Sequence, residues 1–227
     1  MKNLLEIAIV MTVRKSSTRC KNKLLRSYAG TTLIDIALNK ISKIDDHEVF
    51  VGAYEREFKE KIKSYPNITL IERSKESAYI TGSEQNAGKK LFEMYNKLDH
   101  KWIFWINPCH AFLKIKTIQK AIKKFSQIPN RSMTSVKKLN GWYYDKNGKP
   151  LNHQNDSYMG VRETDYLYIA DHAFHAYERT MPLKGKYWDN IVGDPYLYTI
   201  DYDEAYDIDT EDDFLISEAL YKSKIKI

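Results

Sequence analysis

The sequence of 227 residues predicts an α/β fold, with a mostly parallel sheet and helices on both of its faces. Three observations support this fold class. Short apolar segments alternate with amphipathic segments along nearly the whole chain, as in repeated strand–helix–strand units. The segments at residues 7–11 and 102–106 are apolar at consecutive positions, which is typical of strands covered on both faces. The length is sufficient for a core that needs no disulfides or metals, so we expect one domain over residues 1–227.

The first half of the chain predicts a regular alternation of strands and helices. Strands are expected at residues 7–11, 48–53, 68–71 and 102–106, where β-branched and aromatic residues dominate. Three helices are expected between them: from a Thr31-Thr32 cap to residue 41, at residues 55–64 before Pro66, and from Gly82-Ser83 through residue 98.

The second half predicts a change in this pattern. A helix at residues 117–125 and a strand at 132–136 continue the alternation. The turn sequence Asp145-Lys146-Asn147-Gly148 then lies between two aromatic or apolar segments and predicts a β-hairpin, which we expect to form an arm within residues 140–165. The last elements are expected to be a strand at 166–170, a short helix at 171–178, a strand at 196–200 and a helix after Thr210 that turns Phe214, Leu215, Ala219 and Leu220 inward.

Composition narrows the possible partners. The net charge of +6 suits anionic ligands, but the lysines are scattered over predicted helices and no basic stripe with exposed aromatics is evident, so we expect no nucleic-acid partner. No apolar run is long enough to span a bilayer, and we expect no membrane partner. The two cysteines, Cys20 and Cys109, suggest neither a disulfide framework nor a CxxC metal site, which is typical of a cytoplasmic protein.

The loop after the first strand, residues 14–23, carries three cations, Arg14, Arg19 and Lys23, together with three hydroxyl side chains. Guanidinium, ammonium and hydroxyl donors at the end of a buried strand are suited to binding a polyphosphate. The alternative is a basic surface loop whose side chains are solvated. Neither GxxxxGK(S/T) nor GxGxxG occurs in the loop, so it predicts neither a P-loop ATPase nor a dinucleotide-binding protein.

A second candidate site lies near the other end of the chain. Asp207 and Asp209 are two residues apart in an extended segment, so their carboxylates point the same way and can share one hard cation, with Mg²⁺ favoured if phosphate oxygens complete its coordination. Thr210 and Asp213 have the spacing of a helix-capping box, which explains part of this segment without a metal. The two interpretations are compatible. A cationic loop and a carboxylate pair at one sheet edge suggest metal-assisted attack on a nucleotide phosphate.

The histidines support either structural or functional roles. His110 lies at the end of a predicted strand, where it could contact substrate or be a hydrogen-bonded core residue. His172 and His175 are three residues apart, and without a further ligand this spacing more often serves structure than zinc. Pairing Ser17 with a histidine as in a hydrolase is disfavoured because no GxSxG sequence accompanies it.

Several of these segments carry a resemblance to a known family. Arg14-x-x-Ser17-Thr18-Arg19-x-x-x-Lys23-x-Leu25, with Ala29-Gly30 and Leu33-Ile34, resembles the N-terminal signature of the cytidylyltransferases that activate 3-deoxy-manno-octulosonate and acylneuraminate sugars. Residues 207–214, Asp-Ile-Asp-Thr-Glu-Asp-Asp-Phe, resemble the C-terminal signature of the acylneuraminate branch, which includes CMP-sialic acid synthetase. Residues 73–78 resemble the family's Arg-Pro-x-Glu-Leu-Ala segment, and residues 107–114 stand in the place of its Pro-Thr-Ser-Pro-Leu-Arg.

The resemblance implies a Rossmann-like three-layer nucleotidyltransferase fold that transfers CMP from CTP to the anomeric hydroxyl of an acidic keto-acid sugar, with Mg²⁺ and with release of pyrophosphate. It also implies a homodimer in which an extension, here residues 140–165, completes the partner's site. The predicted site residues are Arg14, Lys23 and Asp209 as catalytic, Arg14, Ser17, Arg19, Lys23, Arg73 and Ser83 as nucleotide-binding, Asp207 and Asp209 as metal ligands, and His110, Gln154 and Tyr168 as acceptor-binding.

The sequence departs from the family pattern where the acceptor is selected. Lys15, Ser16, Lys21 and Asn22 replace the family's loop glycines and proline, and Pro108-Cys109-His110-Ala111 replaces Pro-Thr-Ser-Pro. We therefore expect an acceptor other than ordinary sialic acid, within a pathway for a surface polysaccharide or glycoprotein. The alternatives are a nucleotidyltransferase or sugar transferase for another acceptor, and a binding protein built on a degenerate transferase site.

Overall fold

The structure is a computed structural model that describes residues 2–80, 87–152 and 165–225. Its centre is a seven-stranded sheet in the order β5-β4-β1-β6-β8-β7-β9. Among the described strands of this sheet, β8 is the one that runs antiparallel to both of its neighbours. The strands are β1 (Ile7–Thr12), β4 (Val49–Ala53), β5 (Ile68–Glu72), β6 (Trp102–Ile106), β7 (Met133–Leu139), β8 (Leu167–Glu178) and β9 (Tyr196–Thr199). The predicted α/β class with a mostly parallel sheet is confirmed.

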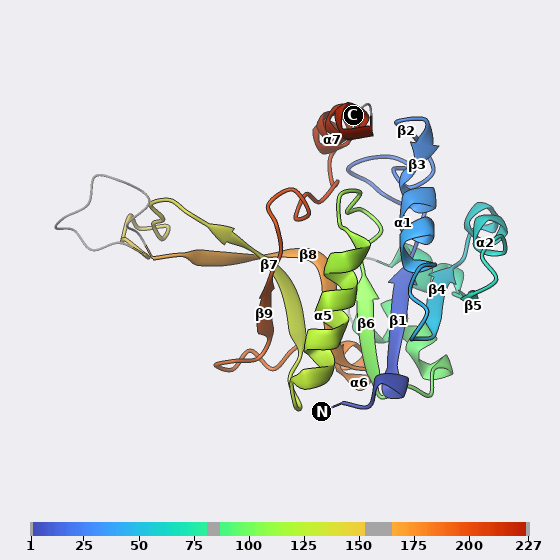
Figure 1. The fold of residues 1–227 in the computed structure, drawn as a ribbon, viewed down its shortest axis with the longest axis horizontal. Helices are drawn as coiled ribbons and strands as arrows, with labels where there is room; N and C mark the ends of the chain where they lie inside the picture. Colours follow the sequence, from blue (N-terminus) through green and yellow to red (C-terminus); the bar gives the residue numbers. More distant parts are fainter. Residues whose placement is uncertain (1, 81–86, 153–164, 226–227) are drawn as a thin grey trace.

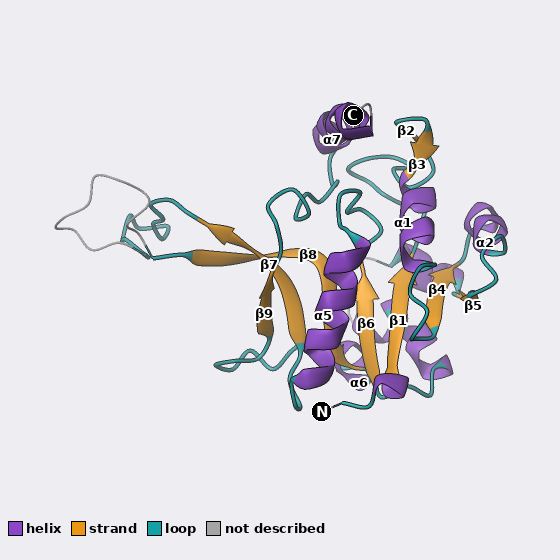
Figure 2. Cartoon of the chain, viewed as in Figure 1, coloured by secondary structure: helices purple, strands orange, loops and turns teal. Residues whose placement is uncertain are grey.

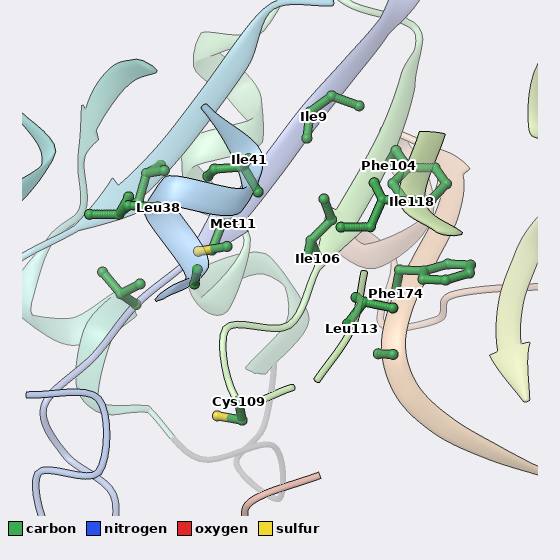
Figure 3. Close-up of a cluster of buried hydrophobic side chains, with 14 of the residues drawn as sticks. Ile9, Met11, Leu38, Ile41, Phe104, Ile106, Cys109, Leu113, Ile118 and Phe174 are labelled. Atoms are coloured by element: carbon green, nitrogen blue, oxygen red, sulfur yellow. The ribbon is translucent and has the colours of Figure 1, made fainter. Parts of the chain in front are cut away.

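β1 is buried on both faces because its side chains alternate between two hydrophobic cores. Ile7, Ile9 and Met11 belong to the larger core, whereas Ala8 and Val10 belong to the smaller core on the opposite face. Figure 3 shows side chains of the larger core, with Ile9 and Met11 facing residues of α1, β6 and α5. This arrangement explains why the sequence of β1 is apolar without interruption.

Helices on both faces complete a three-layer architecture (Figure 1). The larger core is covered by α1 (Leu33–Ile41), α2 (Arg56–Ile62), α5 (Ile115–Gln127) and the start of α7 (Glu211–Ile225). The other face is covered by residues of α4 (Ala87–Leu91), the 3₁₀ helix η2 (Glu93–Lys97) and α6 (Thr180–Leu183). The short elements are α3 (Lys75–Tyr79), the 3₁₀ helix η1 (Leu4–Glu6) and the two-stranded sheet of β2 (Ser27–Tyr28) and β3 (Thr31–Thr32).

The first helix, α1, begins where the predicted cap indicates. The hydroxyl of Thr32 accepts a hydrogen bond from the backbone N–H of Asp35 and caps α1, as predicted. The turn between β2 and β3 places Ala29 and Gly30 at φ angles of +50° and +82°. Two consecutive positive φ angles match the tight turns that connect twisted antiparallel strands, and glycine adopts such angles without strain.

The predicted short helix at residues 171–178 is wrong. These residues belong to β8, a strand of twelve residues that pairs with β6 on one side and β7 on the other. Its alanines favour a helix locally, but residues 173–177 are all buried between two neighbouring strands, so sheet pairing outweighs propensity. His172 has a φ of +60° where the β7–β8 register shifts, which marks a bulge.

Two helix predictions were wrong in part. The predicted helix through residue 98 is interrupted after α4, and η2 follows as a 3₁₀ segment, so that Phe92, Met94 and Tyr95 are all buried. The start of this prediction, at Gly82-Ser83, lies outside the described residues. In α7, Phe214 is buried as predicted, but Leu215, Ala219 and Leu220 are exposed.

The outer parts of β7 and β8 form an arm that projects from the body of the molecule (Figure 1). The predicted hairpin lies in this arm as a turn closed by one β-bridge, between Tyr144 and Pro150, and not as two strands. Asp145 stabilises the turn by accepting hydrogen bonds from the backbone N–H groups of Asn147 and Lys149. Within the described residues, none of the helices combines the length and the apolar composition that a bilayer-spanning helix requires.

Candidate active site

A cavity of about 260 Å³ lies where β1 and β6 end. Six of the residues predicted from sequence line it: Arg14, Ser17, Arg19, Lys23, Arg73 and Asp209. Figure 2 shows the loops that follow β1 and β6, and the segment that precedes α7, above the same edge of the sheet. The carboxyl edge of a parallel sheet is where doubly wound α/β proteins bind ligands.

The loop after β1 is held by contacts with two other parts of the chain. The backbone N–H of Lys15 donates to Glu55 (N to Oε1, 2.8 Å), and Ser16 Oγ donates to the carbonyl of Ala78 at 3.3 Å. Arg14 Nη1 donates to the carbonyl of Ile80 at 3.2 Å. The conformation of the cationic loop is therefore set by Glu55 after β4 and by residues at the end of α3, in addition to its own sequence.

Arg73 lies beneath the cavity, and its hydrogen bonds hold neighbouring parts of the chain together. Its side chain donates to the carbonyl of Val13 (Nη1 to O, 3.1 Å) and to both the hydroxyl and the carbonyl of Ser77. The residue is only 4% exposed, and burial lowers the pKa of its guanidinium to about 10, so the group remains charged at neutral pH. Arg73 therefore ties the end of β1 to α3 while presenting positive charge to the cavity.

Asp209, which precedes α7, forms ion pairs with two cations of the loop after β1. Its Oδ1 lies 3.1 Å from Lys23 Nζ, and its Oδ2 lies 2.8 Å from Arg19 Nη2. Lys23 also donates to the carbonyl of Ile208 at 2.6 Å. Burial by itself would lower the pKa of Lys23, but Cys109, Asp209 and Asp207 around the ammonium raise it overall. The cations predicted to hold phosphate and the carboxylate predicted to hold metal are thus in direct contact.

Asp207 and His110 face each other beside this contact. Asp207 Oδ1 lies 3.8 Å from His110 Nδ1, and both atoms are buried without a hydrogen-bond partner among the described residues. His110 Nε2 lies 3.0 Å from the carbonyl of Asp171, which can only accept, so Nδ1 carries the lone pair of a neutral ring. Burial lowers the pKa of His110 to about 3, and burial with the nearby charge of Asp209 raises the pKa of Asp207 to about 7.

The capping box at the start of α7 is also present. Thr210 Oγ1 accepts from the backbone N–H of Asp213 at 3.2 Å, and Asp213 Oδ2 accepts from the N–H groups of Asp209 and Thr210. The predicted cap is confirmed, and it leaves the side chains of Asp207 and Asp209 available for other contacts. Capping and cation binding are therefore compatible in this segment.

Asp207 is not among the residues that line the first cavity with Asp209, so the metal site formed by both carboxylates stays a prediction. Each carboxylate nevertheless has a feature that suits a hard divalent cation. Asp207 has a buried oxygen without a donor, which an added cation would satisfy, and Asp209 is 36% exposed in its side chain. The described residues contain no group of three or more Asp, Glu, His or Cys placed to hold a metal. Two carboxylates with remaining positions left for phosphate and water match the usual coordination of Mg²⁺ better than that of a closed protein site.

A second cavity of about 300 Å³ adjoins Asp207 at the base of the arm. It is lined by Lys137 of β7, by Asp171 and His172 of β8, and by Tyr202, Tyr206 and Asp213 from the C-terminal part. Lys137 is the one lysine or arginine among its described lining residues. The segment from Asp207 to Asp209 thus lies between the two cavities.

The residues predicted to bind the acceptor are placed differently from one another. His110 is 1% exposed, and its ring contacts Asp171 and Asp207 from inside the protein. Tyr168 is 47% exposed on the arm. Gln154, which is also predicted to bind the acceptor, lies outside the described residues. Ser83, which is predicted to bind the nucleotide, lies outside them as well. His172 and His175 form a hydrogen-bonded pair with 2.9 Å between Nδ1 and Nε2, which matches the structural interpretation of their spacing.

Sequence reasoning did not identify some residues of the two cavities. They include Trp105 in the first cavity and Lys137 in the second. Asn107 and Cys109 also line the first cavity, and they belong to the segment 107–114 that the resemblance singled out. Trp105 was assigned only to a buried strand, although its position near the carboxyl end of that strand was a usable signal. Lys137 offered no such signal, since it follows the predicted strand in a run of polar residues.

Comparisons with known proteins concern the family and the fold of this chain. A family model described as cytidylyltransferase matches residues 7–223. A solved CMP:2-keto-3-deoxy-manno-octonic acid synthetase in complex with CTP is similar with a TM-score of 0.64 and 11% identity, over 96% of this chain and 99% of that chain. A 4-diphosphocytidyl-2C-methyl-D-erythritol synthase from Anaerococcus prevotii is similar with a TM-score of 0.61 and 14% identity, over 96% and 97%. At these identities the two structures show a shared fold. A search of curated protein sequences gave no significant match.

Proposed function

The chain belongs to the cytidylyltransferase family and is thus a CTP-dependent enzyme, and from this premise we propose that it transfers CMP to the anomeric hydroxyl of an acidic keto-acid sugar. One observation supports the proposal most directly. Asp209, of the carboxylate pair, meets Lys23 and Arg19, of the cationic loop, in the cavity at the carboxyl edge of the sheet. A site that combines acidic metal ligands with phosphate-binding cations is suited to phosphoryl chemistry.

The chain's own residues have distinct tasks in this proposal. Arg14, Arg19 and Lys23 bind the triphosphate, with Ser17 lining the same cavity. Asp207 and Asp209 would hold Mg²⁺, which when bound neutralises charge on the phosphate oxygens. Lys23 is anchored by the carbonyl of Ile208 and stabilises charge that develops on the departing pyrophosphate without moving.

The acceptor is proposed to bind in the second cavity. This cavity adjoins Asp207, so a hydroxyl bound there would approach a nucleotide phosphate held in the first cavity. The attacking hydroxyl oxygen would form a bond to the α-phosphorus and lose its proton to water, as the bond from the α-phosphorus to the oxygen that bridges to the β-phosphate breaks and pyrophosphate leaves. The direct test is pyrophosphate release with CTP, Mg²⁺ and a panel of keto-acid sugars. Release only with a phosphorylated methylerythritol would instead favour the activity named for the second similar structure.

The preference for CTP can be measured separately from turnover. CTP is expected to raise the melting temperature more than UTP, GTP or ATP at the same concentration, because a ligand that binds the folded state stabilises it more as its Kd falls, with a logarithmic dependence. Preference for a purine nucleotide would contradict cytidylyl transfer. If no nucleotide stabilised the protein at millimolar concentration, the alternative of a degenerate binding protein would be favoured.

Lys137 provides a test of whether the acceptor is acidic. Lys137→Ala is expected to raise the KM for a keto-acid sugar about 10- to 100-fold, because a charge-assisted contact with a carboxylate would be lost, and to leave the KM for CTP unchanged. The matched control is Lys138→Ala, since Lys138 points away and lies over the ring of Tyr166. Equal effects of the two substitutions on acceptor KM would remove Lys137 from the acceptor site.

The arm is proposed to form a homodimer interface. It exposes apolar side chains, including Leu151 at 55% and Ile169 at 46%, on a projection that packs against little of its own chain (Figure 1). Leu151→Glu is expected to shift the molecular mass measured by light scattering from dimer to monomer. Val192→Glu is the control, because Val192 is fully exposed on a different loop. A wild-type protein that is monomeric at all concentrations would refute the dimer.

A further inference from the structure

Both oxygens of the Asp209 carboxylate are already in contact with cations of the protein. Lys23 Nζ lies 3.1 Å from Oδ1, and Arg19 Nη2 lies 2.8 Å from Oδ2. Each oxygen could still accept a further partner, but a divalent cation bound there would lie close to the Lys23 ammonium or the Arg19 guanidinium. Charge repulsion therefore makes the cation compete with at least one of the two side chains. Either Lys23 or Arg19 would then leave the carboxylate.

The surroundings of the two cations differ sharply. The Lys23 side chain is 12% exposed and also donates to the carbonyl of Ile208 at 2.6 Å. The Arg19 side chain is 66% exposed, so it can leave Asp209 without losing packing and with water as a replacement partner. Exposed ion pairs are weak, whereas a buried ammonium with two acceptors is costly to displace. Arg19 is therefore the side chain that moves.

Arg19 also lines the cavity in which the triphosphate is proposed to bind. A triphosphate carries several negative charges and offers a guanidinium paired oxygens, which makes it a stronger partner than one exposed carboxylate. Binding of the nucleotide would draw Arg19 away and leave Asp209 Oδ2 open.

We propose that Arg19 is a positioning residue that exchanges Asp209 for the triphosphate, so that nucleotide binding opens the metal site and the two ligands bind with positive coupling. The inference rests on the proposed function of this site. In the absence of nucleotide, Arg19 holds the carboxylate and opposes binding of a divalent cation. By linkage, the cation in turn releases Arg19 for the nucleotide.

The test compares Arg19→Gln with the wild-type protein in two separate binding measurements. Binding of Mn²⁺ without nucleotide, followed by the electron paramagnetic resonance of the free ion, is expected to be about 5-fold tighter in Arg19→Gln, because the competing ion pair is gone. Binding of CTP in the presence of EDTA, followed by calorimetry, is expected to be at least about 10-fold weaker, because a phosphate contact is lost. A purely structural role for Arg19 would weaken both.

The matched control is Lys21→Gln. Lys21 is an exposed residue of the same loop, so its substitution removes one positive charge from the neighbourhood without removing the contact with Asp209. Equal tightening of Mn²⁺ binding in Lys21→Gln, or unchanged or weaker binding in Arg19→Gln, would overturn the inference. Failure of the proposed function is a different result, in which the wild-type protein binds no CTP with or without Mg²⁺.

Discussion

Asp209→Asn is expected to lower pyrophosphate release about 10²- to 10³-fold at saturating CTP, Mg²⁺ and acceptor. The substitution keeps the shape of the side chain but removes the negative charge that faces Lys23 and Arg19 in the cavity. An amide is a poor ligand for a hard cation compared with a carboxylate, so charge on the phosphate oxygens would be less well neutralised. Loss of one group that stabilises the transition state commonly has an effect of this size.

Asp212→Asn is the matched control for this experiment. Asp212 is exposed in the first turn of α7 and carries the same charge close in sequence. It is expected to leave the rate unchanged. Binding of CTP measured in EDTA should be retained in Asp209→Asn, because the cations of the loop remain. Full activity of Asp209→Asn would remove Asp209 from the metal site.

Arg73→Met is expected to destabilise the folded protein by about 3 kcal/mol, even in the absence of any ligand. The guanidinium donates to the carbonyl of Val13 and to two atoms of Ser77 inside the protein, and these acceptors would lose their donors. Leaving buried polar groups unsatisfied costs about 1–3 kcal/mol each, partly offset here by the greater ease of burying methionine. For a chain of this size the melting temperature should fall by about 6–12 °C.

Arg56→Met is the control for the exchange of arginine for methionine. Arg56 lies in α2 with a side chain that is 88% exposed, and its ion pair with Glu60 is a surface contact. We expect its melting temperature to remain within about 2 °C of the wild type, because such pairs contribute little. A wild-type melting temperature for Arg73→Met together with lost CTP binding would make Arg73 a nucleotide ligand without a structural role.

Much of the first half of the fold was predictable because its signals are local. The strands β1, β4 and β6 are nearly continuous apolar runs, β5 is rich in β-branched residues, and the cap of α1 depends on the hydroxyl of one residue, Thr32. The helix expected at residues 171–178 failed for the opposite reason. Its alanines would suit a helix, but pairing with β6 and β7 is a property of distant parts of the chain, and it determined the structure of β8.

The exposed apolar residues of α7 illustrate the same limit. Helical spacing shows which residues share a face, but not which face meets the core. Phe214 is buried because it packs against Tyr28 and the Arg26 guanidinium, whereas Leu215 and Leu220 are on the other side and are exposed. Only the docking of α7 against Arg26 and β2 distinguishes the two faces.

The sequence by itself determined that a cationic loop follows the first strand, that a carboxylate pair precedes the last helix, and that a mostly parallel sheet brings both to one edge. These conclusions depend on residue type and spacing over short distances. The tertiary structure decided that Arg73 is buried as a structural donor, that His110 lies inside behind Asp207, and that Asp209 contacts Lys23 and Arg19. Burial and ion pairing depend on which distant side chains come within a few ångströms, and a single sequence does not specify those distances.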